Sequence, residues 1–351
     1  MKIMTANDAL TDVVGLRVGH AQVTGELALT GTTVVLAPEG GVIAAVDVRG
    51  GGPATKETDA LDPRNLVQRV EAIVLTGGSA YGLDSASGVM AWLEERGRGV
   101  RVSSDPAQVV PVVPAAGIFD LGRGGDWRMR PDAATGRAAV EAAAATASGA
   151  PVAEGGVGAG TGAAVGPLKG GVGTASMRLG SGVTVAALVV ANAAGSAVDP
   201  LTGVLYGRYY DGRTDYPAAE VHEAALRRLA EVREQSGPAP LNTTLAVVAT
   251  DAELTRSQAQ KLAGTAHDGI ARAVRPVHLL NDGDTVFTLA TGQLPLAESD
   301  PLALNEVLAA GADVVTRAIV RAVLAAQGVA GPGGMLPSYT DLYGPGRAKG
   351  V

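Results

Sequence analysis

The segment LNTTLAVVATDA (241–252) holds two threonines directly before an apolar, β-branched run that is typical of a buried strand. A threonine hydroxyl that follows a strained peptide can attack the preceding carbonyl, move the acyl group from nitrogen to oxygen, and let water split the ester. A chain that then starts at Thr243 carries an α-amine with a pKa near roughly 7.7–8.0, which can accept the proton of its own hydroxyl. Two plainer interpretations stay open: Asn242-x-Thr244 matches a glycosylation sequon, and threonine is common at the start of a strand.

Other short Val/Ile runs, each ending in Gly, Pro or Asp, predict further strands around this one. They lie at 32–38, 41–48, 72–78, 182–191 and 285–292. Helical patterns predict helices at 84–96, 132–148, 217–235, 255–274 and 301–327. A capping box, Thr255-x-x-Gln258, opens the fourth helix, and 236–242 (SGPAPLN) has the composition of a linker. Because strands come in adjacent groups with helices appended, the pattern favours a mixed pair of sheets with helices outside them.

The composition excludes several functional classes. The chain has 351 residues, of which 46% are apolar and 18% charged, so it can bury a large core. Its net charge of −7 argues against a nucleic-acid partner and against an anionic membrane surface. It has no cysteine and only four histidines, which excludes thiolate chemistry and argues against a metal centre. The start lacks a secretory signal, and the uncharged stretch 179–198 has only a short apolar centre, so we expect a cytoplasmic protein.

Two glycine-rich segments have both a functional and a structural interpretation. Gly158-x-Gly160-x-x-Ala163 is one form of a dinucleotide fingerprint, which would indicate an oxidoreductase, but no clear strand precedes it and no acidic residue follows to bind a ribose. GGSAYG (77–82) resembles a nucleophile elbow around Ser79 but misses the G-x-S-x-G spacing by one residue. Both segments also fit glycine-permitted turns, the second of them leading from a strand into a helix.

Three charged side chains are candidates for chemistry. Asp282 and Asp284, in NDGD (281–284), form either an ordinary turn or a pair of carboxylates that orients a cationic amine. Lys169 is the only basic residue between 151 and 177. It is either an ordinary exposed lysine or, in an apolar pocket, a group with a shifted pKa that donates to a developing oxyanion.

The sequence resembles the DmpA-type self-processing aminopeptidases (peptidase family S58), which include β-peptidyl aminopeptidases and nylon-oligomer hydrolases. The similarity runs from about Gly15 to Leu324, and several motifs carry it in the same order. They are VDVRGG (46–51), LTGGSAYGLD (75–84), VPAAGIFDL (113–121), GAGTGAAVG (158–166), KGGVGTAS (169–176), VVANAAG (189–195), LNTTLAVVATDA (241–252), AHDGIARAVRP (266–276) and DGDTVF (282–287).

This resemblance implies an α/β fold of two β-layers between helices, an αββα sandwich layered like the N-terminal-nucleophile hydrolases. It implies one hydrolase domain, 1–351, cut between Asn242 and Thr243 into an α chain (1–242) and a β chain (243–351) that stay together and form homo-oligomers. No metal or organic cofactor is implied. The site residues that it implies are the nucleophile Thr243, the oxyanion donor Asn192, Lys169, and the acidic pair Asp282 and Asp284, which positions the nucleophile and its amine.

The family's activity implies release of N-terminal residues from short peptides or from amino-acid amides and esters. Endo-type hydrolysis of ω-amino-acid (nylon-like) oligomers is the alternative within the family, and a dinucleotide-dependent oxidoreductase or a non-catalytic glycine-rich assembly protein are the alternatives outside it. One departure bears on substrate choice, because Phe119 stands where the nylon-hydrolase branch has a tyrosine. Tyr81 is a candidate to supply the missing hydroxyl, and Ser79 is a further candidate for the substrate pocket.

Overall fold

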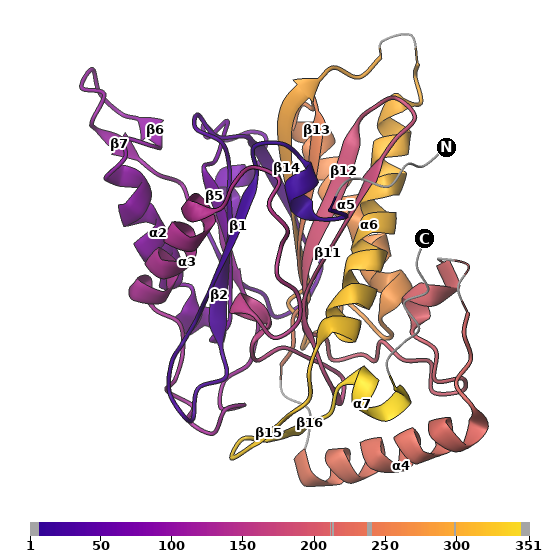
Figure 1. Cartoon of the computed structure of the whole chain (residues 1–351). Coiled ribbons are helices and arrows are strands. Elements are labelled where there is room, and N and C mark those ends of the chain that lie inside the picture. Colours follow the sequence, from indigo (N-terminus) through magenta and orange to yellow (C-terminus); the bar gives the residue numbers. More distant parts are fainter. Residues whose placement is uncertain (1–6, 211, 213, 237–240, 298–299, 345–351) are drawn as a thin grey trace.

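Two five-stranded sheets lie face to face between two pairs of helices in the computed structural model, which describes residues 7–210, 212, 214–236, 241–297 and 300–344 (Figure 1). The first sheet has the order β1 (Arg17–Gln22), β2 (Gly31–Leu36), β5 (Ala72–Thr76), β8 (Ala115–Gly117) and β4 (Ala54–Lys56). The second has the order β11 (Gly171–Arg178), β12 (Thr184–Ala191), β13 (Leu245–Ala252), β14 (Thr285–Leu294) and β3 (Ile43–Val48).

Helices cover the outer face of each sheet. The first sheet packs against α2 (Ser85–Glu94) and α3 (Ala133–Ala145), and the second against α5 (Arg256–Ala273) and α6 (Ala303–Ala325). The remaining helices are α1 (Ser79–Gly82), α4 (Ala219–Ser236) and α7 (Tyr339–Tyr343), with 3-10 turns at Leu10–Asp12, Asp59–Leu61, Gly158–Gly160 and Tyr206–Tyr210. Three short strand pairs complete the fold: β6 (Val100–Arg101) with β7 (Val109–Val110), β9 (Ala164–Val165) with β10 (Leu168–Lys169), and β15 (Val329–Gly331) with β16 (Gly334–Leu336).

Strand β13 shows how one strand contributes to two cores. Leu245 and Val247 lie in the apolar cluster between the sheets, whereas Ala246 and Val248 lie in the cluster beneath α5 and α6. Successive side chains of a strand point to opposite faces, and both faces of β13 are covered, so all of its residues are buried. The αββα layering that the resemblance implied is confirmed.

The strand directions bring several candidate site residues to one edge of the second sheet. β13 runs parallel to β14 and antiparallel to β12. The starts of β13 and β14 therefore lie beside the end of β12. Thr243 stands two residues before β13, Asp284 directly precedes β14, and Asn192 directly follows β12.

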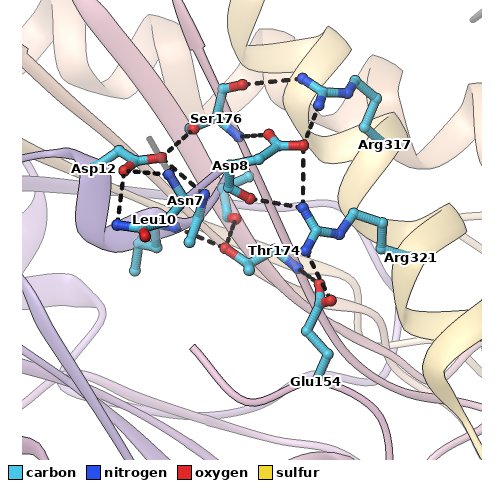
Figure 2. Close-up of polar contacts among 11 residues, drawn as sticks. Asn7, Asp8, Leu10, Asp12, Glu154, Thr174, Ser176, Arg317 and Arg321 are labelled. Atoms are coloured by element: carbon cyan, nitrogen blue, oxygen red, sulfur yellow. Dashed lines mark hydrogen bonds and ion pairs between the residues drawn. The ribbon is translucent and has the colours of Figure 1, made fainter. Parts of the chain in front are cut away.

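The N-terminal segment is anchored to β11 and α6 by polar contacts (Figure 2). The carboxylate of Asp8 accepts a hydrogen bond from the Ser176 amide at 2.8 Å and pairs with Arg317 at 2.5 Å and Arg321 at 3.1 Å. Arg321 also contacts Glu154 at 2.8 Å. These contacts join the first described residues to a helix near the other end of the chain.

The strands and helices predicted from local patterns are present, with boundaries that differ by a few residues. Several elements were not predicted, among them β1, whose sequence RVGHAQ has little apolar alternation, and short strands such as β4 and the three-residue β8. Of the predicted linker 236–242, positions 237–240 lie outside the described residues. None of the helices in the described ranges combines the length and the apolar character that a membrane span requires.

Candidate active site

Thr243 is buried, and its hydroxyl lies against the peptide bond that precedes it. The residue is 4% exposed. Its Oγ1 donates a hydrogen bond of 2.6 Å to the carbonyl oxygen of Asn242, and the Gly283 amide donates a second one, 3.0 Å long, to the same oxygen. The Thr243 amide donates to the main-chain oxygen of Asn192 at 2.8 Å. The hydroxyl therefore lies against a carbonyl group whose oxygen accepts two hydrogen bonds, one from the hydroxyl itself and one from Gly283, and both polarise the carbonyl.

The turn at 282–284 leaves room for this hydroxyl because residue 283 has no side chain. A Cβ on Gly283 would lie 2.6 Å from Thr243 Oγ1. On its other side the turn packs against the main chain of 49–52, whose amides donate three hydrogen bonds of 2.7 to 3.3 Å to carbonyl oxygens of the turn. The motif VDVRGG (46–51) thus helps to hold the turn that faces the nucleophile candidate.

Asn192 supplies a buried hydrogen-bond donor beside Thr243. Its side-chain Oδ1 accepts hydrogen bonds from Arg123 Nη1 at 2.6 Å and from the Ala164 amide at 3.0 Å. Two donors on one atom identify that atom as the oxygen, so the orientation of the amide is determined. Nδ2 is fully buried and has no partner among the described residues. A buried, unpaired N–H group at this place can donate to an oxyanion.

Arg123 belongs to no motif discussed above, yet it joins the two asparagines. Nη1 contacts Asn192 Oδ1 and the Gly162 carbonyl oxygen, each at 2.6 Å, and Nη2 donates to Asn242 Oδ1 at 2.9 Å. Burial lowers the pKa of Arg123 to about 10, an effect that the nearby Asp120 opposes, so the guanidinium stays charged at neutral pH. Its partners lie 69 and 119 residues away in the sequence, which is why no local pattern marks it.

Lys169 is buried rather than exposed, with 1% of its surface accessible. Nζ donates to the carbonyl oxygens of Gly160 at 2.9 Å and Gly170 at 2.7 Å. Burial, and after it the charge of Arg123, lower the pKa of Lys169 to about 7. The interpretation as a lysine with a shifted pKa is therefore favoured. Its hydrogen bonds go to the glycine loop, and its link to the Thr243 cluster is the electrostatic interaction with Arg123.

The two aspartates have different surroundings. Asp284 Oδ1 accepts a hydrogen bond of 2.7 Å from the Thr244 amide, while Oδ2 contacts the amide nitrogen and Nδ1 of His278 at 3.1 and 2.8 Å. Asp282 Oδ1 accepts from the Ala194 amide at 3.2 Å, whereas its buried Oδ2 has no partner in the part of the chain that the structure describes. Burial, and then the charge of Asp284, raise the pKa of Asp282. Both oxygens of Asp284 therefore have hydrogen-bond partners, whereas Oδ2 of Asp282 is available to an amine.

The three pocket candidates lie on α1 and after β8. Ser79 has a φ of 51°, the strained backbone of a sharp turn between strand and helix. Tyr81 is 56% exposed, with the Arg130 guanidinium 3.9 Å above its ring. Phe119 packs edge to face against Trp127, with ring centroids 5.9 Å apart. None of these contacts involves Thr243, so a role of the three residues in a substrate pocket stays a prediction.

The dinucleotide interpretation of the glycine-rich segment gains no support. Gly158–Gly160 is a 3-10 turn, and a Cβ on Gly160 would lie 2.5 Å from the Val172 amide nitrogen. Close backbone packing therefore explains the glycine. Within the described ranges, no group of three or more His, Asp or Glu side chains could hold a metal ion.

Comparison with known proteins gives matches over most of the chain. The model of peptidase family S58 matches residues 8–336. An uncharacterized aminopeptidase of Mycobacterium tuberculosis is 47% identical over 361 residues, covering 96% of this chain and 98% of that protein. A 6-aminohexanoate-oligomer endohydrolase of a Kocuria species is 33% identical over 289 residues, covering 81% of this chain and 75% of that protein. The structure of a Burkholderia beta-aminopeptidase superposes with a TM-score of 0.73 at 27% identity, covering 97% of this chain and 94% of the other.

Proposed function

The chain belongs to peptidase family S58, and from this premise we propose that it is a self-processing aminopeptidase whose nucleophile is Thr243. As a member of this family it is a hydrolase of peptide or amide bonds. The observation that carries the proposal is the 2.6 Å hydrogen bond from Thr243 Oγ1 to the carbonyl oxygen of Asn242. A hydroxyl in that position is placed to react with its own chain.

Self-cleavage begins with attack of Thr243 Oγ1 on the carbonyl carbon of Asn242. The hydroxyl proton passes to the Thr243 nitrogen, the C–N bond breaks, and an ester forms. The Gly283 amide, 3.0 Å from the carbonyl oxygen, stabilises the negative charge that develops there. Water then hydrolyses the ester, leaving a carboxylate on Asn242 and a free amine on Thr243. The products are residues 1–242 and 243–351.

In the cut enzyme, the Thr243 amine serves as the general base for the Thr243 hydroxyl. A free α-amine has a pKa near roughly 7.7–8.0, so about a tenth to a sixth of it is unprotonated at pH 7 and able to accept a proton. Oγ1 attacks the substrate amide, the amine passes the proton to the leaving nitrogen, and water hydrolyses the acyl-enzyme. We assign the unpaired Nδ2 of Asn192 as the donor to the oxyanion, because it is buried and its amide is held in one orientation by Arg123.

The charged residues around the nucleophile have supporting parts in this proposal. Asp284 holds the Thr244 amide and so directs the start of β13. Asp282, which pairs with Asn242 through a parallel bridge, offers its unpaired Oδ2 to the amine that the cut releases. Lys169, with a pKa lowered to about 7 by burial and by Arg123, is only partly charged at neutral pH and acts on the site through its electrostatic interaction with Arg123.

The proposed substrates are short peptides or amino-acid amides and esters from which the N-terminal residue is released. Proteins named aminopeptidases are among both the relatives and the solved structures. Endo-type hydrolysis of ω-amino-acid oligomers is the second candidate, supported by the similarity to a 6-aminohexanoate-oligomer endohydrolase. Phe119 lacks the hydroxyl of that branch, which favours the first candidate. Assembly into homo-oligomers and a cytoplasmic location stay predictions.

The decisive experiment is intact mass measurement of the denatured protein. Wild-type protein should give pieces of about 24 and 11 kDa by residue proportion, and N-terminal sequencing of the smaller piece should begin at Thr243. The Thr243→Ala variant should remain whole and hydrolyse no amino-acid amide. Wild-type protein that is fully active while uncut, or a Thr243→Ala variant that is cut and active, would refute the proposal.

A further inference from the structure

His278 holds the buried carboxylate of Asp284 through two donors. Its main-chain N–H and its Nδ1 both contact Oδ2, at 3.1 and 2.8 Å. The residue does so with a φ of 58°, a left-handed backbone that is uncommon for a residue with a side chain. Asp284 is 1% exposed, and its other oxygen accepts the Thr244 amide proton. A strained backbone maintained beside a reacting group suggests a role in the site.

A second histidine packs against the ring of His278. The ring centroids of His278 and His267 lie 4.9 Å apart, with the planes at 76°. Burial lowers the pKa of His267 to about 4, so its ring is neutral at neutral pH and has a single N–H. Nε2 lies 3.0 Å from the main-chain carbonyl oxygen of Asp47, which accepts a hydrogen bond from it. Contacts therefore run from β3 through two imidazoles to the carboxylate beside the nucleophile.

We propose that His278 is a positioning residue for the nucleophile Thr243. An ionised carboxylate can only accept hydrogen bonds, so Nδ1 of His278 carries the proton, and this bond fixes the rotation of the Asp284 carboxylate. The fixed Oδ1 then holds the Thr244 amide and, with it, the peptide plane next to Thr243. The inference rests on the proposed function, because that function gives Thr243 its part in the reaction.

Two substitutions distinguish the contribution of the His278 imidazole from that of its main-chain N–H. His278→Gly permits the left-handed backbone and keeps the main-chain N–H, so it removes only the imidazole. His278→Asn also tolerates that backbone and offers a side-chain N–H near the position of Nδ1. Since a displacement of about 1 Å can cost about 10²-fold in rate, we expect kcat per cut chain to fall about 10²-fold in His278→Gly with little change in KM. His278→Asn should recover most of this loss, and the rate of self-cleavage should follow the same order.

The control is His222→Asn, because the His222 ring contacts Tyr343 at 3.1 Å in another part of the fold, and it should behave as wild type. Wild-type kcat in His278→Gly overturns the proposal, and so does a His278→Asn variant as impaired as His278→Gly. If thermal melting shows that the glycine variant is unfolded at the assay temperature, all variants are compared at a lower temperature, below its melting midpoint. Failure of the proposed function is recognised separately, from an uncut active wild type or an active Thr243→Ala variant.

Discussion

Replacing Gly283 by alanine tests whether the position of the Thr243 hydroxyl governs self-cleavage. The new Cβ would lie 2.6 Å from Thr243 Oγ1, whereas ordinary van der Waals contact begins near 3.4 Å, and the main-chain carbonyl oxygen of Gly52 would lie only 2.9 Å from the same Cβ. Gly283 is not among the residues with positive φ, so alanine adds no backbone strain, and the amide that donates to Asn242 is retained. The hydroxyl must therefore move by about 0.8 Å, and a displacement of about 1 Å can cost about 10²-fold in rate.

We expect freshly purified Gly283→Ala to be largely uncut and to cleave itself about 10²-fold more slowly than wild type. Intact mass of denatured samples, taken over time, gives the rate, and thermal unfolding measured in parallel reports any general loss of stability. Gly180→Ala is the matched control, because a Cβ at that position meets nothing within 4 Å. If the folded Gly283→Ala protein cleaves at the wild-type rate, the reasoning about the hydroxyl is wrong.

Two further predictions concern the neighbours of the nucleophile. Asn192→Ala should keep the fold but lower kcat by about 10²–10³ for an amino-acid amide, the usual cost of losing an oxyanion donor, and a near-normal kcat would remove Asn192 from the mechanism. Lys169→Met should change how stability depends on pH. Because the pKa of Lys169 falls from 10.5 to about 7 on folding, the unfolded chain binds more protons between these values, so the free energy of unfolding rises with pH across that window. Urea unfolding of the uncut Thr243→Ala protein should show this rise and lose part of it with Lys169→Met, and an unchanged slope would contradict the lowered pKa.

Hydrophobic periodicity and capping motifs in the sequence predicted the longer helices and strands, whose formation depends on local contacts and on burial of one face. The capping box of Thr255 and Gln258 forms as expected, and α5 covers Arg256–Ala273 where 255–274 was predicted. The strand predicted after the two threonines, β13, begins at Leu245, so neither Thr243 nor Thr244 belongs to it. Their amides donate hydrogen bonds to the candidate site instead of to a neighbouring strand. The Thr243 amide donates to the Asn192 carbonyl oxygen, and the Thr244 amide donates to the carboxylate of Asp284.

The candidate site was predictable only in part. The resemblance supplied Thr243 and Asn192, and the structure brings these two into direct contact. Arg123 and His278 were missed, because their importance lies in partners that only the fold brings near. Arg123 sits in an unremarkable LGRGG segment (121–125), and its guanidinium reaches asparagines on two distant segments. For His278 the only sequence signal was its position shortly before the acidic pair.

The strand order of the second sheet would also decide what can happen to the enzyme after the proposed cut. β13 and β14 would belong to the smaller product, and both of their flanking strands, β12 and β3, to the larger one. Separating the products would break the hydrogen bonds between β12 and β13 and between β14 and β3. It would also expose the apolar clusters on both faces of the sheet to water, so the cut molecule would stay together without a covalent bond. Once unfolded, however, its halves would have to meet by diffusion, and recovery would become bimolecular and dependent on concentration. Synthesis as one polypeptide would therefore let the strands of the two products pair once, before the proposed cut.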